Sequence, residues 1–348
     1  MKKSFFLLLA LIAFQFSPFS FHLKAETVPA TDSRITFVGR SVIENDSYRF
    51  DFPSTYFRVS FTGKKLSMRV TDTKRNYYAV FVNTPTSAEP TRIVEVKGTD
   101  TIIDLVLPAD LKPLKTKEYQ VVIQRRTEAN CGTTTVKEFI TDGKFLQAEQ
   151  LKARQIEFIG DSYTCGYGID AASRTERFSP ETENASRSYA GIVSRYFGAD
   201  YVAIAHSGMG IARNYNSKFK GWWMPDRYLQ TFDMDSTQNT RWDATQSDFH
   251  PAMTIVYLGA NDFSTSLAPK YEDFRKHYYR LFDYIKANYG EEHPILCVAT
   301  KTHEYLFNYV RDLVNNCGMK NVNYLGYCPA QHLHTDEDLG ADVHPNYN

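Results

Sequence analysis

The feature that most constrains the fold is a change in sequence pattern near residue 150. From about Thr36 to Ile140, short runs rich in β-branched and aromatic residues recur, with Gly, Asp, Asn and Pro between them. The runs are ITFVG, SYRF, YFRVSF, KLSMRV, YYAVFVN, RIVEVKG, TIIDLVL, EYQVVIQ and TVKEFI. Strand-like runs every ~8–12 residues, without a convincing helical window, favour an antiparallel sandwich. We therefore predict a β-sandwich (jelly-roll) domain over residues 26–150.

The second part of the chain alternates apolar strand-like runs with amphipathic stretches. The strand-like runs are IEFIG, YVAIA, MTIVYLG, PILCVAT and VNYLGY, and the helical stretches fall at 189–197, 271–289 and 303–314. This βα alternation predicts a three-layer α/β/α domain with a mostly parallel sheet over residues 151–348. In such domains the functional side chains lie in the loops that follow the carboxyl ends of the strands.

The first 25 residues have the pattern of an export signal. Met1-Lys2-Lys3 precedes an uncharged, mostly apolar run from Ser4 to Ala13, as in the n- and h-regions of a signal peptide. The run is shorter than the ~20 apolar residues that a membrane-spanning helix needs. We predict cleavage after Ala25 and a secreted or periplasmic protein that is not inserted in the membrane afterwards.

The composition bears on nucleic-acid binding and on the state of the cysteines. Lys and Arg together number 40, as do Asp and Glu, and this balance argues against a nucleic-acid binder. Five cysteines are too few for a disulfide scaffold, and none stands in a C-x-x-C pair, so we expect mostly buried free thiols. The sequence leaves the disulfide state and the oligomeric state open.

Three of the strand-like runs lead into loops with polar or glycine-rich motifs. IEFIG continues into GDS with Ser162, YVAIA into HSGMG with Gly208, and MTIVYLG into GAND with Asn261. A serine in a tight turn after a buried strand is well placed as a nucleophile. A backbone N–H at a glycine and an asparagine carboxamide can both donate to a developing oxyanion. Each motif taken alone is also compatible with an ordinary turn.

A histidine near the end of the chain extends the set. His344 stands in GADVHP, where the following proline stiffens the loop. Taken alone it reads as a surface histidine. Together with three strand-end motifs in one domain, in the order Ser, Gly, Asn, His, it predicts a base for Ser162.

The strings GDSYTCGYG, SGMG, GAND and DVHP resemble the four blocks of the SGNH, or GDSL-type, hydrolase superfamily, over about Ile156 to Asn346. The longer strings GDSYTCGYG, AHSGMGIARNY and GADVHPN, behind a β domain, are similar more narrowly to carbohydrate esterase family 2, the acetyl xylan esterases. The resemblance implies an exported serine esterase without a cofactor. Its expected partner is an acetylated polysaccharide or oligosaccharide, such as plant cell-wall xylan or glucomannan.

Residue by residue, the resemblance makes Ser162 the nucleophile and His344 its base. The backbone N–H groups of Ser162 and Gly208 and the side chain of Asn261 would form the oxyanion hole. The superfamily usually has Asp three residues before His, whereas this chain has Asp342 two before. We predict that Asp342 accepts the far ring N–H, since residues i and i+2 of an extended segment point the same way. The alternative is a Ser-His dyad in which a backbone carbonyl orients the ring.

Two other segments bear on the site. Trp222 and Trp223, in KGWWMPDRY, are predicted to line a sugar-binding cleft, with a core or lid packing pair as the alternative. The acid-rich stretch at 334–338 is interpreted as solvated surface, so we predict no metal site. His206, beside the HSGMG motif, is interpreted as a packing histidine, and His250 and His303 receive no role.

Two other classes of function stay open. One is a carbohydrate-binding protein with a hydrolase fold and little turnover, which the intact Ser162, Asn261 and His344 disfavour. The other is a GDSL hydrolase directed at a lipid or thioester. The lack of a long apolar lid-like helix in the sequence weighs against that reading.

Overall fold

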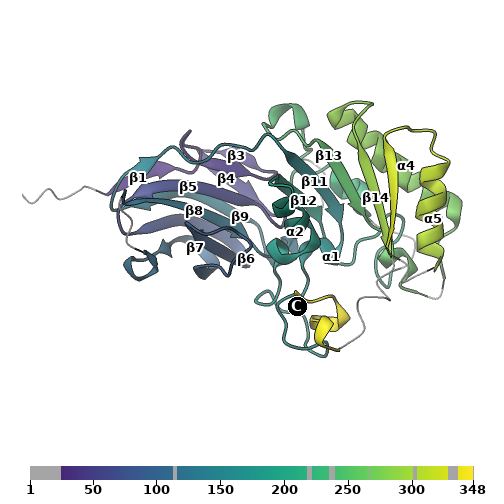
Figure 1. The fold of residues 1–348 in the computed structure, drawn as a ribbon, viewed down its shortest axis with the longest axis horizontal. Coiled ribbons are helices and arrows are strands. Elements are labelled where there is room, and N and C mark those ends of the chain that lie inside the picture. Colours follow the sequence, from purple (N-terminus) through teal and green to yellow (C-terminus); the bar gives the residue numbers. More distant parts are fainter. Residues whose placement is uncertain are drawn as a thin grey trace, which may run out of the picture.

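The computed structural model describes residues 25–112, 116–217, 222–234, 240–265, 267–300, 304–327 and 336–347. Over these residues the chain forms a β domain followed by an α/β domain, which lie beside each other in Figure 1. Among the described residues, no helix has the length and apolar character needed to cross a bilayer. The signal peptide lies almost wholly outside them and stays a prediction.

The N-terminal domain is antiparallel, as predicted. Its strands are β1 (Glu26–Pro29), β2 (Thr36–Val38), β3 (Val42–Glu44), β4 (Ser47–Phe50), β5 (Tyr56–Thr62), β6 (Leu66–Val82), β7 (Arg92–Val106), β8 (Glu118–Arg125), β9 (Thr134–Thr141) and β10 (Phe145–Leu146). They form one hydrogen-bonded sheet in the order β10-β5-β8-β6-β9-β4-β3, with β1 on β9, β2 on β5 and β7 on β6. The sheet curves around an apolar core that includes Phe50, Phe57 and Phe139.

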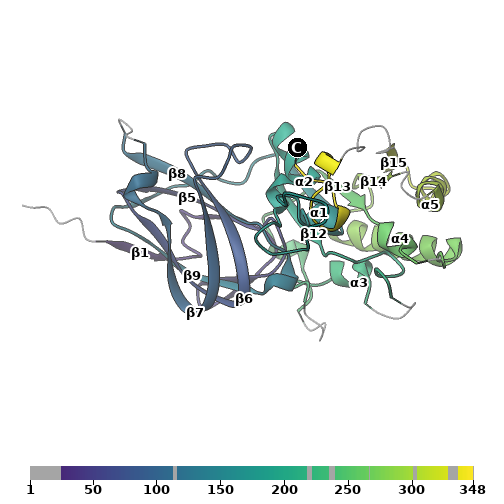
Figure 2. The same ribbon diagram turned by 90° about the horizontal axis from the view of Figure 1, so that it is seen from below.

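Two strands of this domain are longer than the sequence pattern predicts. The runs KLSMRV and YYAVFVN belong to the single strand β6, and RIVEVKG and TIIDLVL belong to β7. The polar stretch inside β6 contains register shifts at Val70/Asp72 and Asp72/Arg75 instead of a turn. β6 pairs with β9 from Leu66 to Asp72 and with β8 from Tyr78 to Val82, so the irregular stretch lets one strand serve two parts of the curved sheet. Figure 2 shows both long strands bending along the domain.

The second domain has the predicted parallel sheet. Its strands are β11 (Gln155–Gly160), β12 (Asp200–Ala205), β13 (Met253–Tyr257), β14 (Ile295–Thr300) and β15 (Val322–Tyr327), and its helices are α1 (Ser162–Cys165), α2 (Tyr189–Tyr196), α3 (Met224–Tyr228), α4 (Tyr271–Tyr289) and α5 (Glu304–Asn315). The strand order is β12-β11-β13-β14-β15. Ile159 and Val256 pack with α3, α4 and α5, whereas the alternate residues Phe158 and Ile255 pack with α2. Helices therefore cover both faces.

Buried polar side chains join the two domains. The guanidinium of Arg40, which is 2% exposed, lies 3.1 Å from the carboxylate of Glu157 in β11. The hydroxyl of Tyr56 donates to Asp200 at the start of β12, at 2.8 Å. A buried charge or polar group is costly without a partner, so these pairs hold the domains in one relative position.

The cysteines of the described residues are free thiols, as expected. Cys131, Cys165 and Cys297 are buried, and Cys317 is partly exposed. Cys328 lies outside the described residues, as do His303 and the first two residues of the predicted surface stretch at 334–338.

Candidate active site

Ser162 stands in a sharp turn between β11 and α1. The strand ends at Gly160 and the helix begins at Ser162, with Asp161 as the residue that caps it. The Asp161 carboxylate accepts the backbone N–H of Tyr163 at 3.2 Å. A Cβ on Gly160 would lie 1.9 Å from the hydroxyl oxygen of Thr164, so this turn requires glycine. The turn places Ser162 at the carboxyl edge of the sheet.

His344 lies within hydrogen-bond distance of that serine. Its Nε2 is 2.9 Å from Oγ of Ser162, although 182 residues separate the two in the sequence. Figures 1 and 2 both place the C-terminal segment close to α1. Burial lowers the pKa of His344 below its ordinary value of 6.5. The imidazole is therefore neutral near pH 7 and able to take a proton from the serine.

Asp342 is placed differently from the prediction. Its backbone is left-handed (φ 48°, ψ 38°) within the 3₁₀ turn Ala341–Val343, so the segment is not extended. Its carboxylate accepts hydrogen bonds from the Tyr167 hydroxyl at 2.9 Å, from Arg177 at 3.0 Å and from the Phe178 N–H at 3.2 Å. The expected hydrogen bond to the His344 ring is thus replaced by contacts that point elsewhere.

The other ring nitrogen of His344 faces the backbone. Nδ1 lies 3.3 Å from the carbonyl oxygen of Ala341, which is the geometry of the alternative dyad. The ring of Tyr167 packs against the imidazole with a centroid distance of 4.3 Å, and the ring of Tyr163 meets it edge-on at 5.7 Å. The imidazole is oriented by a carbonyl group and by two aromatic rings.

The loops with Ser162, Gly208 and Asn261 begin next to one another. Gly160 of β11 is in register with Ala205 of β12 on one side and with Tyr257 of β13 on the other. Gly208 has φ +80°, which favours glycine. Among the hydrogen bonds of the described residues, none uses the backbone N–H of Ser162 or Gly208 as its donor. Within the described ranges, these two main-chain donors are therefore free at this edge.

Asn261 links the same loops through its carboxamide. Its Nδ2 donates to Asp161 at 3.1 Å and to the carbonyl of Met209 at 2.9 Å. Burial raises the pKa of Asp161 to about 7. Asn261 thus lies between the turn of Ser162 and the loop of Gly208, with both amide hydrogens engaged.

Asp262 organises the loop that follows Gly208, a role that the sequence analysis missed. Its carboxylate accepts the backbone N–H groups of Ile211, Ala212 and Arg213 at 2.9, 2.8 and 2.8 Å. It is fully buried, and burial raises its pKa to about 7. An acid directly after the asparagine in GAND was the available signal in the sequence.

The two tryptophans point to different neighbours. The ring of Trp222 lies under the guanidinium of Arg227, 4.6 Å from its centre. The ring of Trp223 meets His277 of α4 edge-on at 4.7 Å, which is the packing alternative. Tyr215 is a more accessible aromatic, being 64% exposed, and its backbone N–H donates to the carbonyl of Gly208 at 2.7 Å. Tyr215 was not among the residues expected from the sequence to lie at the site.

His206 is a buried histidine with partners on both ring nitrogens. Its Nδ1 contacts the carboxylate of Asp233, and its Nε2 lies 3.1 Å from the side-chain amide of Asn130 in the N-terminal domain. This agrees with the packing role expected from the sequence. It also brings a residue of the β domain to the loop that carries Gly208.

Comparison with known protein families gives two matches. Residues 37–148 match the family described as carbohydrate esterase 2 N-terminal. Residues 156–338 match GDSL-like lipase/acylhydrolase, which is more than half of the chain. The chain therefore belongs to the GDSL-like lipase/acylhydrolase family and carries the N-terminal domain of family 2 carbohydrate esterases.

Individual relatives are similar in sequence and in structure. The chain is 30% identical over 293 residues, 83% of its length, to cellulase/esterase CelE of Acetivibrio thermocellus, of which it spans 34%. It is 30% identical over 238 residues, 66% of its length, to an acetylxylan esterase / glucomannan deacetylase of Cellvibrio japonicus, of which it spans 61%. A solved family two carbohydrate esterase from Clostridium thermocellum, in complex with cellohexaose, has a TM-score of 0.79 and 28% identity. That similarity covers 90% of this chain and 93% of the solved one.

Proposed function

We propose that this protein is an exported serine esterase that removes O-acetyl groups from plant cell-wall polysaccharide, with acetylated xylan or glucomannan as the substrate class. The observation that carries the proposal is the 2.9 Å contact between Oγ of Ser162 and Nε2 of His344 at the carboxyl edge of the sheet. The names of the relatives support the substrate class. The positively charged and apolar N-terminal stretch supports export.

The proposed reaction proceeds by acyl transfer through a Ser-His dyad. His344 takes the hydroxyl proton of Ser162 at Nε2 while Oγ forms a bond to the acetyl carbonyl carbon. The protonated ring then gives this proton to the sugar oxygen as the carbon–oxygen bond to the sugar breaks, leaving an acetyl-serine. Water attacks the acetyl-serine by the same steps and releases acetate. The carbonyl of Ala341 holds the ring through the N–H on Nδ1.

The tetrahedral oxygen would be stabilised by the free N–H groups of Ser162 and Gly208 and by the amide of Asn261. The two backbone donors have no other acceptor among the described residues. One N–H of the Asn261 amide would turn from its present acceptor, Asp161 or Met209, and donate a hydrogen bond to the oxyanion as charge develops there. Exposed Tyr215 beside Gly208 would offer a ring face to a sugar, with Trp222 as a second candidate.

Acetate release from acetylated xylan, acetylated glucomannan and an aryl acetate tests the proposal. Wild-type protein should release acetate from at least one polysaccharide, and Ser162→Ala should lower its rate at least ~10⁴-fold without unfolding. Retention of a tenth of the wild-type rate would remove Ser162 as the nucleophile. Faster cleavage of octanoyl than acetyl esters would favour a lipid-directed hydrolase. Polysaccharide binding without turnover would favour the binding protein.

A further inference from the structure

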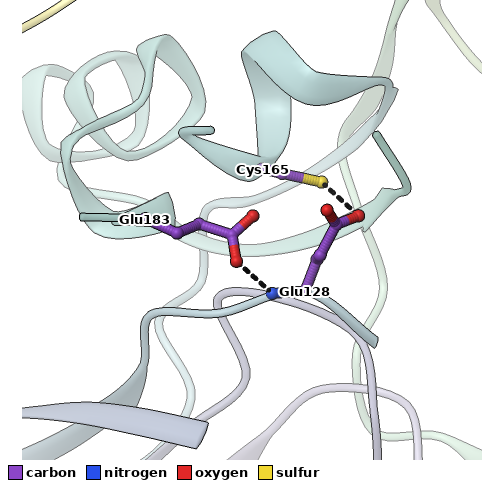
Figure 3. A group of neighbouring side chains, drawn as sticks. All are labelled: Glu128, Cys165 and Glu183. Carbon is purple, nitrogen blue, oxygen red and sulfur yellow. Dashed lines mark hydrogen bonds between the residues drawn. The ribbon is translucent and has the colours of Figure 1, made fainter. Parts of the chain in front are cut away.

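The N-terminal domain inserts one turn into the neighbourhood of Ser162. The turn follows β8 and comprises Glu128 and the 3₁₀ turn Ala129–Cys131. The side chain of Glu128 lies among residues of the α/β domain, and the residue is 1% exposed. Figure 3 shows its carboxylate close to Cys165 and Glu183, both of which come from the other domain.

One oxygen of Glu128 joins two elements of the candidate site. Oε2 accepts the backbone N–H of Ser207 at 2.7 Å and the thiol of Cys165 at 3.7 Å. Ser207 immediately precedes Gly208, and Cys165 ends the helix that Ser162 begins. The same atom therefore fixes the loop of the free Gly208 N–H relative to the helix of the nucleophile.

The turn that carries Glu128 is itself held firmly. Oε2 of Glu183 accepts the backbone N–H of Glu128 at 2.9 Å and the thiol of Cys131 at 3.8 Å. Asn130 contacts His206, two residues before Gly208. The guanidinium of Arg125 lies 3.0 Å from the carbonyl of Glu128. Glu128 is thus a preorganised acceptor rather than a flexible surface carboxylate.

Burial shifts the pKa values of the two side chains that lie next to the Glu128 carboxylate. Burial and the nearby Glu128 raise the pKa of Glu183 well above its ordinary value. Oε1 of Glu183 has no hydrogen-bond partner in the described part of the chain. Burial also raises the pKa of the thiol of Cys165, which therefore stays a donor. One potential ligand atom from each of Glu128, Cys165 and Glu183 lies within 4.8 Å of the other two, close enough to surround a cation. Metal binding is therefore included among the outcomes of the test below.

We propose that Glu128 is a positioning residue of the esterase site, through which the N-terminal domain sets the Gly208 N–H against Ser162. The proposal rests on the proposed function, because its purpose is to align an oxyanion donor. The β domain is then part of the active site and not only a brace for the α/β domain.

The test compares three variants on an aryl acetate. Glu128→Met removes the acceptor at similar length and should lower kcat about 10²-fold with KM within about three-fold, the pattern for a lost transition-state donor. Glu128→Gln keeps a carbonyl acceptor for Ser207 and should stay within about five-fold of wild type. Tyr56→Phe is the matched control, since it removes a buried cross-domain hydrogen bond at the opposite end of β12. It should lower thermal stability and leave kcat within about two-fold.

Three kinetic outcomes would overturn the proposal. One is a folded Glu128→Met with wild-type kcat. Another is a Glu128→Gln as slow as Glu128→Met, because the charge and not the acceptor would then matter. The third is a loss of kcat with a chelator that zinc restores, because Glu128 would then act as a metal ligand.

Hydrogen exchange gives a readout that does not depend on activity. The Ser207 amide should exchange at least ~10-fold faster in Glu128→Met than in wild type, with no such change in Tyr56→Phe. Equal exchange in Glu128→Met and wild type overturns the positioning role. If wild-type protein and Ser162→Ala hydrolyse the ester equally slowly, the proposed function fails, and the exchange result still decides the role of Glu128.

Discussion

Ser162 and His344 are held in position by different kinds of structure. Ser162, Gly208 and Asn261 each stand within four residues of the end of a buried parallel strand, so the edge of the sheet brings them together. His344 instead follows a 3₁₀ turn that is held by residues distant in the sequence. The N–H of Ala341 donates to Gly168 at 3.2 Å, and the N–H of Asp342 donates to Glu176 at 3.0 Å.

This difference shows which parts of a site follow from local sequence. A strand end specifies both the position and the direction of the next few residues, because the register of the sheet is fixed. The histidine loop takes its direction from Tyr167, Phe178 and the backbone around them. Asp342, two residues before His344, contacts Arg177 in this loop, and the ring of His344 faces the carbonyl of Ala341 instead.

Of the substitutions that test this difference, removal of His344 should have the largest effect on kcat. His344→Ala should lower kcat at least ~10⁴-fold, since Ser162 remains a neutral alcohol without its base. Single-turnover hydrolysis of an aryl acetate measures the loss, and circular dichroism checks the fold. A decrease of only a few-fold would mean that another residue is the base and that Ser162 and His344 do not act as a pair.

Among the residues that follow strand ends, Asn261 should have the next largest effect. Asn261→Ala should lower kcat by about 10²–10³ with little change in KM. In the proposed mechanism the carboxamide donates to the oxyanion in the transition state and does not contact the bound ground-state substrate. Steady-state kinetics on the aryl acetate separate the two parameters. A change confined to KM would assign Asn261 to substrate binding instead.

The pH dependence of kcat/KM tests the protonation state of His344. In the proposed mechanism only neutral His344 accepts the serine proton. Burial lowers the pKa of His344 below 6.5, so the neutral form persists into mildly acidic solution. The acid limb of kcat/KM should therefore fall below pH 6.5, with about a tenfold loss for each pH unit beneath that pKa. An acid limb centred at pH 7 or above would mean that a carboxylate raises the pKa of the ring.

Much of the architecture could be predicted from the sequence, because the signals are local. The stretch at 271–289 is α4, and its buried residues Phe274, Tyr278 and Ile285 recur at helical spacing. The strand-end motifs likewise placed the turn of Ser162 and the loop of Gly208 at one edge of the sheet. The continuity of β6 was missed because a polar bulge looks like a turn in sequence.

The parts that escaped prediction depend on contacts between distant segments. Trp223 packs on α4, which no pattern around KGWWMPDRY reveals. Glu128 reaches the loop of Gly208 from the other domain, 79 residues away in the sequence from Ser207. Asp342 has a left-handed backbone that an extended i, i+2 argument did not anticipate. In each case the partner is tertiary, and spacing alone carries no information about it.

The most direct test of the account is the kcat of Asp342→Asn on an aryl acetate at neutral pH, in protein whose thermal unfolding matches that of wild type. In the proposed dyad the carbonyl of Ala341 orients His344, and Asp342 supports only the loop. We therefore expect kcat within about three-fold of wild type and an unchanged KM. A loss approaching ~10⁴-fold, as for a true orienting acid, would contradict it.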